Sequence, residues 1–145
     1  TAFDAIMTTK LIQCNRNSIK VTISALLPEK MPLAEVELSS LLGNLMDNAI
    51  ASCMKLAAAK RYIKIEVRPK AQMLNIHIVN ASDGHYYKDD SGLLLSRKRD
   101  GKELGLGLSI VNSIVNQHSG NLQLRAEEEH FDIDILIPIF QGGVV

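Results

Sequence analysis

Apolar and polar residues follow two different periods along the chain, and each period predicts one kind of element. Apolar side chains recur at helical spacing in residues 2–14, 35–60 and 105–118. Apolar and polar side chains alternate in residues 18–26, 62–69, 73–80, 120–127 and 130–139, which is typical of half-buried strands. The predicted order is therefore helix, strand, helix, two strands, a long loop, helix and two strands.

The connections between these elements indicate the fold class. Short links join residues 62–69 to 73–80 and residues 120–127 to 130–139, as in β-hairpins. Hairpins favour a mixed, mostly antiparallel sheet with the helices on one face, so we expect an α/β (α+β) sandwich of two layers. No internal repeat or linker divides the chain, and 145 residues that are 46% hydrophobic can form one domain with a sizeable core.

Charge and cysteine content exclude several classes of function. Sixteen basic residues balance sixteen acidic ones, so we expect no nucleic-acid partner and no contact of the domain itself with a membrane. The sequence contains no apolar run that could span a bilayer and no signal-peptide pattern. Cys14 and Cys53 have no zinc-ligand spacing and are expected to be buried free thiols in a reducing cytoplasm. Because the chain begins at Thr1 without a methionine, we expect it to be a piece of a longer protein.

A first cluster of polar residues lies within the long helix predicted over residues 35–60. Asn44 and Asn48 are four residues apart and share a helix face, with Ser40 one turn earlier and Lys55 two turns later. Asparagine is a poor helix former, and amide oxygens suit a hard cation such as Mg²⁺. The alternative is that both amides only face water.

A second cluster closes the strand predicted over residues 73–80. Asn80 ends this strand, and Asp83 and Gly84 follow it. Polar side chains at the end of a strand are placed to face a ligand, although turn formation explains the same residue types. The loop over residues 81–103 is polar, rich in glycine and long, and such loops are usually functional or disordered.

The third cluster is the sequence "GLGL", residues 105–108, at the start of the last predicted helix. Glycine destabilises a helix, but Gly105 and Gly107 let an anion approach the main-chain N–H groups at the helix N-terminus. The segment lacks the third glycine and the preceding strand of a dinucleotide-binding motif. A Walker-type phosphate loop is also absent from the sequence, so these glycines predict a different kind of phosphate site.

The order and spacing of the three clusters resemble the GHKL superfamily over about residues 18–140. The chain is most similar to the catalytic ATP-binding domain of sensor histidine kinases, in particular the branch that serves peptide-sensing quorum receptors. The resemblance implies a Bergerat-type fold with ATP and Mg²⁺ as ligands. "NLMDNA" resembles the asparagine box, which implies that Asn48 binds Mg²⁺ with help from Asn44. Relatives that hydrolyse ATP have a glutamate in the place of Asn44, and an amide cannot accept a proton from water.

The resemblance also assigns roles to residues around the nucleotide. Asn80, Ser82 and Gly84 match the adenine-reading DxGxG motif, with its aspartate and first glycine replaced; Asp83 is the alternative adenine reader. Ser96 and Lys98 resemble a Thr-x-Lys-like element of the lid, which would contact phosphates, although a solvated charge run is an equal interpretation of "SRKR". The phosphates would also contact the residues Gly105, Leu106, Gly107 and Leu108.

A histidine kinase of this family phosphorylates a histidine on dimerisation helices, and none of the four histidines lies in the first predicted helix. We therefore expect residues 1–17 to be the end of a dimerisation helix and residues 18–145 to be the catalytic domain, with a nucleotide lid over 81–103. The implied partners are the phosphoacceptor helices of the same kinase and a response regulator, with the domain on the cytoplasmic side of a membrane-anchored receptor. The alternatives are a kinase similar to the anti-sigma-factor kinases and a nucleotide-binding module without catalysis.

Overall fold

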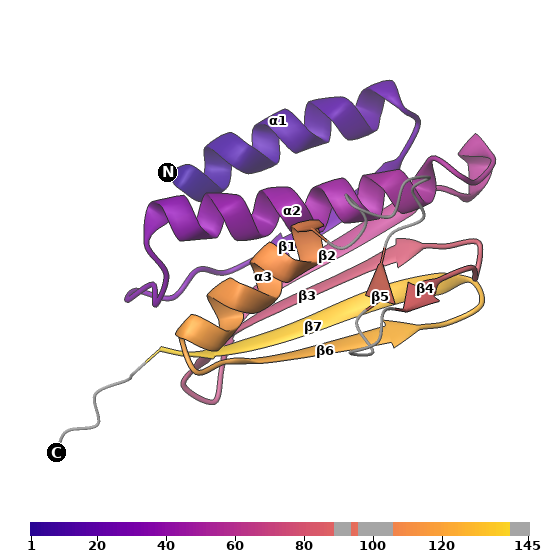
Figure 1. The fold of residues 1–145 in the computed structure, drawn as a ribbon. Helices are drawn as coiled ribbons and strands as arrows, with labels where there is room; N and C mark the ends of the chain where they lie inside the picture. The colour runs from indigo at the N-terminus through magenta and orange to yellow at the C-terminus, as the bar shows by residue number, and fades with distance from the viewer. Residues whose placement is uncertain (89–93, 96–105, 140–145) are drawn as a thin grey trace, which may run out of the picture.

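The computed structural model describes residues 1–88, 94–95 and 106–139, which form helices and strands (Figure 1). The helices are α1 (Ala2–Arg16), α2 (Glu35–Cys53), the short 3₁₀ helix η1 (Ala58–Lys60) and α3 (Leu106–Gln117). The strands are β1 (Lys20–Ala25), β2 (Tyr62–Lys70), β3 (Met73–Ala81), β4 (Tyr87–Lys88), β5 (Leu94–Leu95), β6 (Asn121–Ala126) and β7 (His130–Pro138).

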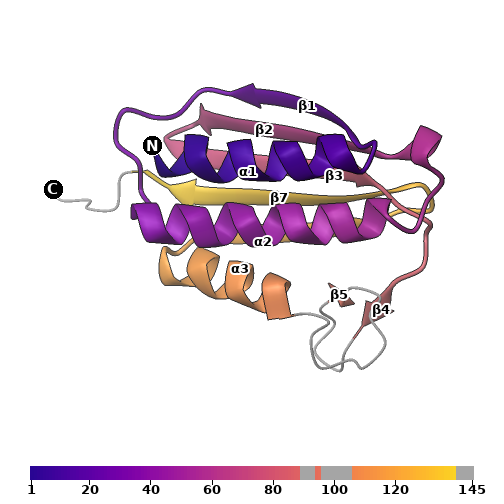
Figure 2. The same cartoon turned by 90° about the horizontal axis from the view of Figure 1, so that it is seen from above.

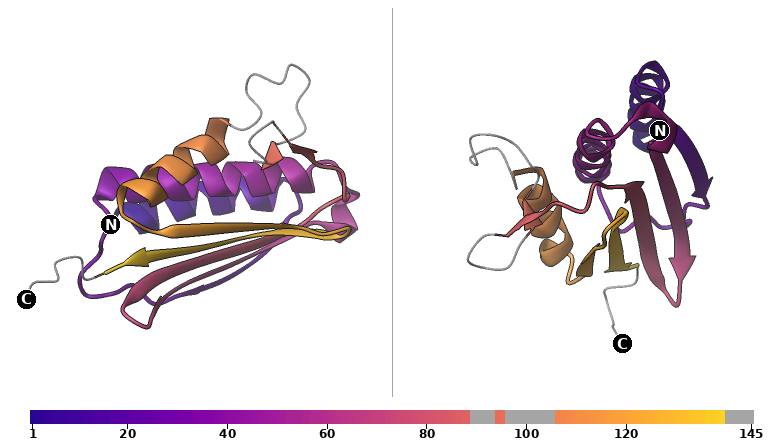
Figure 3. Two further views of the ribbon diagram at one scale, coloured as in Figure 1. Left: turned by 60° about the horizontal axis from the view of Figure 1, so that its bottom comes forward. Right: turned by 90° about the vertical axis from the view of Figure 1, so that its right-hand side faces the viewer.

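Five strands form one open sheet in the order β1-β2-β3-β7-β6. The β1–β2 pair is parallel, and the other three pairs are antiparallel. Helices α1, α2 and α3 lie side by side on one face of this sheet, and none of the helices described lies over the other face (Figures 2 and 3). The predicted mixed sheet in two layers is therefore confirmed.

The core lies between the sheet and the helices. Alternate residues of the central strands point toward the helices, and Ile76 of β3 and Ile135 of β7 are fully buried. Helix α2 fills the middle of the layer with Leu41, Leu45 and Met46, which are at most 1% exposed. Helix α1 shares this core through Phe3, Met7 and Cys14. Both cysteines are free and buried, as predicted.

Helix α2 is shorter than the sequence indicates, since it ends at Cys53 instead of continuing to residue 60. Residues 55–60 have good helix-forming side chains, but tertiary contacts override this preference. The Arg61 guanidinium donates to the main-chain oxygens of Leu56 and Asn17, at 3.0 Å and 2.7 Å, and so draws the chain toward β2. Lys55 consequently lies beyond the helix and does not continue the face of Asn44 and Asn48.

Other differences are small. Helix α1 ends two residues later than predicted, and β1 and α3 are shorter than expected by one or two residues at their ends. The segment 81–103 was expected to be a loop, but its residues Tyr87–Lys88 and Leu94–Leu95 pair as short antiparallel strands. Most of the remaining lid residues lie outside the described part of the chain.

Candidate functional site

Helix α2 holds the two asparagines of the first cluster, Asn44 at its midpoint and Asn48 one turn later. Asn44 and Asn48 are both partly buried and share one face of the helix. The Asn44 amide donates from Nδ2 to the main-chain oxygen of Ser40 at 2.7 Å, which fixes the amide and leaves Oδ1 as an acceptor. Asn48 makes no side-chain hydrogen bond within the described part of the chain. Two amide oxygens are thus available on one helix face.

The start of α3 lies directly against Asn44. A Cβ atom built on Gly107 would lie 3.1 Å from Asn44 Oδ1, which is tighter than an ordinary contact. The first N–H groups of a helix have no partner within the helix, so the first turn of α3 presents donors beside this amide. The structure therefore brings the first and third clusters together, although they are more than fifty residues apart in sequence.

The residues around Gly107 differ in what they can contribute. The side chain of Leu108 is 5% exposed and packs in the core, so only its main chain can face a ligand. Leu106 is the first residue of α3. The predicted phosphate ligands Ser96, Lys98 and Gly105 lie outside the described residues.

The end of β3 carries the second cluster. Asn80 continues the inward-facing series of Ile76 and Ile78, and only 2% of it is exposed. Its Nδ2 donates to the main-chain oxygen of Ala81 at 2.9 Å. The Ser52 hydroxyl of α2 donates to the same oxygen at 3.2 Å, so α2 and the end of β3 are held together here.

The turn after β3 is stabilised by its own side chains. Asp83 Oδ1 accepts the N–H of His85 at 2.9 Å, and the Ser82 hydroxyl accepts the N–H of Gly84 at 3.1 Å. Gly84 has a φ of 80°, and a Cβ there would lie 2.7 Å from the main-chain oxygen of Glu128. Glycine is therefore required at residue 84 by conformation and by space.

Tyr86 fixes the segment that follows the second cluster, a role that the sequence pattern did not predict. Its hydroxyl lies 2.7 Å from both the Ser82 hydroxyl and the main-chain oxygen of Glu127. Its ring packs on Phe131 of β7 with the ring centroids 5.6 Å apart, and burial raises the pKa of its hydroxyl. Tyr86 therefore anchors the chain after Gly84 to the β6–β7 turn. An aromatic residue in an otherwise polar segment was the available signal.

The donor set determines which metal site is possible. Within the described residues, no three His, Cys, Asp or Glu side chains are grouped so that they could hold a metal ion. Amide oxygens on α2 are hard donors that fit Mg²⁺, which usually takes few protein ligands and completes its shell with phosphate oxygens and water.

Of the helices described, none is both long and apolar enough to cross a bilayer.

The sequence matches the GHKL domain family over residues 33–138, which is most of the chain. The chain belongs to the GHKL domain family. A search of curated protein sequences gave no significant match. The matched region of the GHKL domain begins before α2 and ends with β7, and so contains Asn44, Asn48, Asn80 and Gly107.

Solved structures share this fold at low sequence identity. The catalytic domain of histidine kinase ThkA, in a nucleotide-free form, is 17% identical with a TM-score of 0.71, and the match covers 94% of this chain and 90% of that one. The mycobacterial sensor histidine kinase MprB is 18% identical with a TM-score of 0.64, covering 94% and 95%. Acinetobacter baumannii histidine kinase AdeS is 20% identical with a TM-score of 0.63, covering 96% and 66%. The GHKL domain described here therefore has the fold of histidine kinase catalytic domains.

Proposed function

We propose that this chain is the ATP-binding catalytic domain of a sensor histidine kinase, and that it transfers the terminal phosphate of ATP to a histidine outside the chain. The observation that carries the proposal is the contact of Asn44 with Gly107. This contact sets amide oxygens on α2 beside the donor groups of a helix N-terminus. Oxygens for Mg²⁺ and N–H groups for phosphate are the two requirements of a triphosphate site.

The residues of α2 fit the metal that such a site needs. Asn48, with no side-chain partner among the described residues, would be the Mg²⁺ ligand, and Asn44 would assist it. A bound Mg²⁺ would neutralise charge on the phosphate oxygens. Asn44 cannot act as a general base, because an amide oxygen does not take a proton from water at neutral pH. The site therefore favours transfer to an external acceptor over hydrolysis.

The end of β3 supports a role in recognising the base. Asn80 is buried at the strand end, whereas the Asp83 carboxylate already accepts a main-chain N–H in its own turn. An amide oxygen can accept the exocyclic amine of adenine. These two observations favour Asn80 over Asp83 as the adenine reader.

The wider setting of the domain is also part of the proposal. The phosphoacceptor would lie on dimerisation helices of the same kinase, the phosphate would pass to a response regulator, and the receptor would be anchored in a membrane. The boundary between residues 1–17 and 18–145 stays a prediction. Since Phe3 and Met7 of α1 are buried in the common core, α1 packs as part of the helical layer.

The experiment that tests the proposal is calorimetry of ATP binding with and without Mg²⁺. In Asn48→Ala we expect ATP affinity to fall about tenfold or more with Mg²⁺ and much less without it, because only the metal-dependent part is lost. Asn116→Ala, an exposed asparagine of α3, is the matched control and should leave both affinities unchanged. Equal losses in Asn48→Ala under both conditions would remove Asn48 from the metal site, and no ATP binding by the unmodified chain would overturn the proposal.

A further inference from the structure

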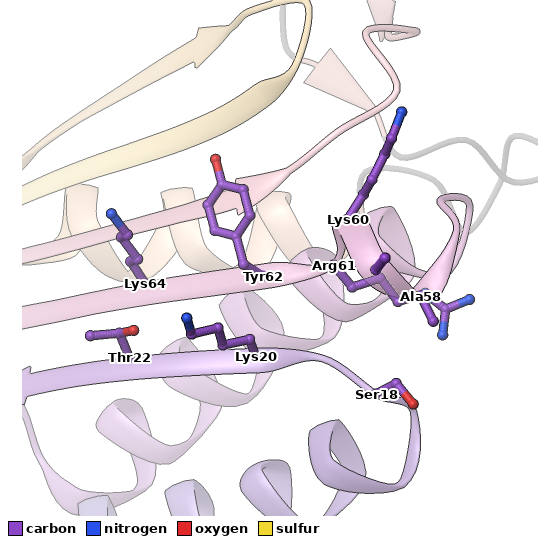
Figure 4. A pocket seen from close by; sticks show the side chains of 9 residues that line it. Ser18, Lys20, Thr22, Ala58, Lys60, Arg61, Tyr62 and Lys64 are labelled. Carbon is purple, nitrogen blue, oxygen red and sulfur yellow. The ribbon is translucent and has the colours of Figure 1, made fainter.

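A pocket lies at the β1–β2 edge of the sheet, on the face away from the helices (Figure 4). Ile63 and Ile65 of β2 point into the core, so the alternate residues Tyr62 and Lys64 point to the uncovered face. The parallel register places Lys20 of β1 opposite Tyr62, and Thr22 opposite Lys64. The pocket has a volume of about 440 Å³. It is lined by Ser18, Lys20, Thr22, Ala58, Ala59, Lys60, Arg61, Tyr62 and Lys64.

The charge of this pocket is entirely positive. Three lysines and one arginine line it, and none of its lining residues in the described part of the chain is acidic. Lys20, Lys60 and Lys64 form no ion pair with any residue that the structure describes. Like charges around one concave surface repel one another, and a bound anion would relieve that repulsion.

Arg61 also lines the pocket and is held by two hydrogen bonds to the main chain. Its Nε and Nη1 donate to the main-chain oxygens of Leu56 and Asn17, which follow helices α2 and α1. These acceptors are main-chain oxygens, so the guanidinium keeps an uncompensated charge within the described structure. The pocket therefore combines one hydrogen-bonded guanidinium with three lysine ammonium groups.

Protection of an exposed sheet edge explains only part of this arrangement. Lysine on an edge strand discourages pairing with other chains, which accounts for Lys20 on β1. Lys64, however, lies on β2, which is paired on both sides. Lys60 is in η1 and Arg61 follows it, so neither belongs to an edge strand.

We propose that this pocket binds a phosphate-bearing anion at a site separate from the nucleotide site. The lysine ammonium groups provide charge-assisted hydrogen bonds to phosphate oxygens. The hydroxyls of Ser18, Thr22 and Tyr62 line the same pocket and can donate to the remaining oxygens. The source of the phosphate is either a soluble metabolite or a lipid headgroup, and both present the same chemistry to these residues.

The test is an NMR titration of the chain with sodium pyrophosphate at low salt, in which binding at the pocket is followed at the main-chain amides of its own residues. The variant pair Lys20→Gln/Lys64→Gln removes two charges from the pocket. Arg68→Gln/Lys70→Gln removes two charges from the same sheet face at exposed positions of β2 that do not line the pocket. We expect saturable shifts at the amides of Thr22 and Lys64, and a dissociation constant raised about tenfold or more by the pocket pair but less than about twofold by the control pair.

A parallel titration with vesicles distinguishes the two sources. Vesicles of phosphatidylcholine with phosphatidylglycerol are compared with phosphatidylcholine alone. Binding to pyrophosphate without vesicle binding supports a soluble ligand, whereas vesicle binding lost in the pocket pair alone supports a headgroup. Equal weakening by both variant pairs would show only general electrostatic attraction and would overturn the proposal, as would the absence of saturable binding to either probe. ATP affinity should be unchanged in the pocket pair, so this test is independent of the proposed kinase function.

Discussion

The contact between Asn44 and Gly107 shows why a glycine is kept at the start of a helix. A side chain at residue 107 would press on the Asn44 amide, since its Cβ would lie 3.1 Å from Oδ1. Glycine lowers helix stability by about 0.5–1 kcal/mol relative to alanine. In return for this lower helix stability, the absence of a side chain at residue 107 lets the first turn of α3 lie against the face of α2 that carries Asn44.

Substitution of Gly107 by alanine tests this interpretation. In Gly107→Ala the gain in helix propensity should offset much of the crowding, so the free energy of unfolding should change by less than about 1 kcal/mol. ATP affinity should fall about tenfold, because Asn44 or the first turn of α3 must shift. Gly43→Ala is the control, as its Cβ would meet Ile6 Cδ1 at an ordinary 3.6 Å. Calorimetry and thermal unfolding measure both quantities, and unchanged ATP affinity in Gly107→Ala would contradict the assignment.

Asn80 and Asp83 offer a second test at the level of single residues. If Asn80 reads adenine, Asn80→Asp should retain ATP binding, and Asn80→Ala should weaken ATP binding more than Asp83→Ala does. An amide can also present its NH₂ group, so discrimination against GTP should be weaker in the unmodified chain than in Asn80→Asp. Competition between ATP and GTP in a binding assay measures this. A loss of ATP affinity in Asp83→Ala but not in Asn80→Ala would move the adenine reader by three residues.

At the scale of elements, α2 and α3 are joined at two places. Asn44 contacts Gly107 near the start of α3, and His118 just after its end lies 2.9 Å from the Glu37 carboxylate through Nε2. Glu37 also accepts the N–H of Ala34 at 2.9 Å and so caps α2. The two helices therefore run antiparallel along the first half of α2, and the phosphate-facing turn of α3 is positioned from both ends.

The Glu37–His118 pair predicts how stability depends on pH. The hydrogen bond from His118, and then the one from Ala34, hold the pKa of Glu37 below its ordinary value of 4.5. Since the pKa is lower in the folded state, this stabilisation is present above pH 4.5 and is lost as the pH falls through the folded-state pKa. In Glu37→Gln we expect a lower free energy of unfolding at neutral pH. This free energy should also decrease less steeply than in the unmodified chain as the pH falls into the acidic range, as measured by urea unfolding at a series of pH values.

A neighbouring glutamate provides the control for this measurement. Glu35 lies in the same first turn of α2 and is exposed, so Glu35→Gln should preserve the pH dependence of the unmodified chain. An unchanged profile in Glu37→Gln would show that the pair contributes nothing to stability.

At the scale of the whole molecule, we expect none of the four histidines to act as the phosphoacceptor, because each lies on an element that is held in place within the fold. His77 is on the uncovered sheet face, with its ring nitrogens 3.8 Å from Glu66 and 3.7 Å from Asp132. His118 is bound to Glu37, His130 begins β7, and His85 follows the turn at the end of β3. Phosphoryl transfer requires an acceptor in line with the terminal phosphate. The proposed phosphoryl transfer therefore requires an acceptor from another segment.

The isolated chain should accordingly bind ATP without phosphorylating itself or hydrolysing ATP quickly. Incubation with radiolabelled ATP should leave the chain unlabelled, and addition of the kinase's dimerisation helices should yield acid-labile phosphate on a histidine of those helices. Acid-labile label on this chain alone would contradict the prediction. ATP binding without transfer to any such helix would favour a non-catalytic nucleotide-binding module.

The sequence by itself determined the elements and the layer arrangement, because these depend on local periodicity. Alternation in residues 73–80 and 130–139 specifies which side chains enter the core, and the helical spacing in residues 35–53 places Asn44 and Asn48 on one face. The type of each main element was predicted correctly for this reason.

Only the tertiary structure decided where α2 ends and which residues meet in the site. The chain leaves the helix at Cys53, and Arg61 then ties the segment after the helix to the end of α1, because it donates both to the carbonyl oxygen of Leu56 and to that of Asn17, forty-four residues earlier. Tyr86 is placed by Ser82 and by the β6–β7 turn, about forty residues away, and Gly107 is placed by Asn44. These contacts join residues that are distant in sequence, and neither helical nor strand periodicity can predict such pairs. They depend on how the helices pack on the sheet, which is determined by the whole chain.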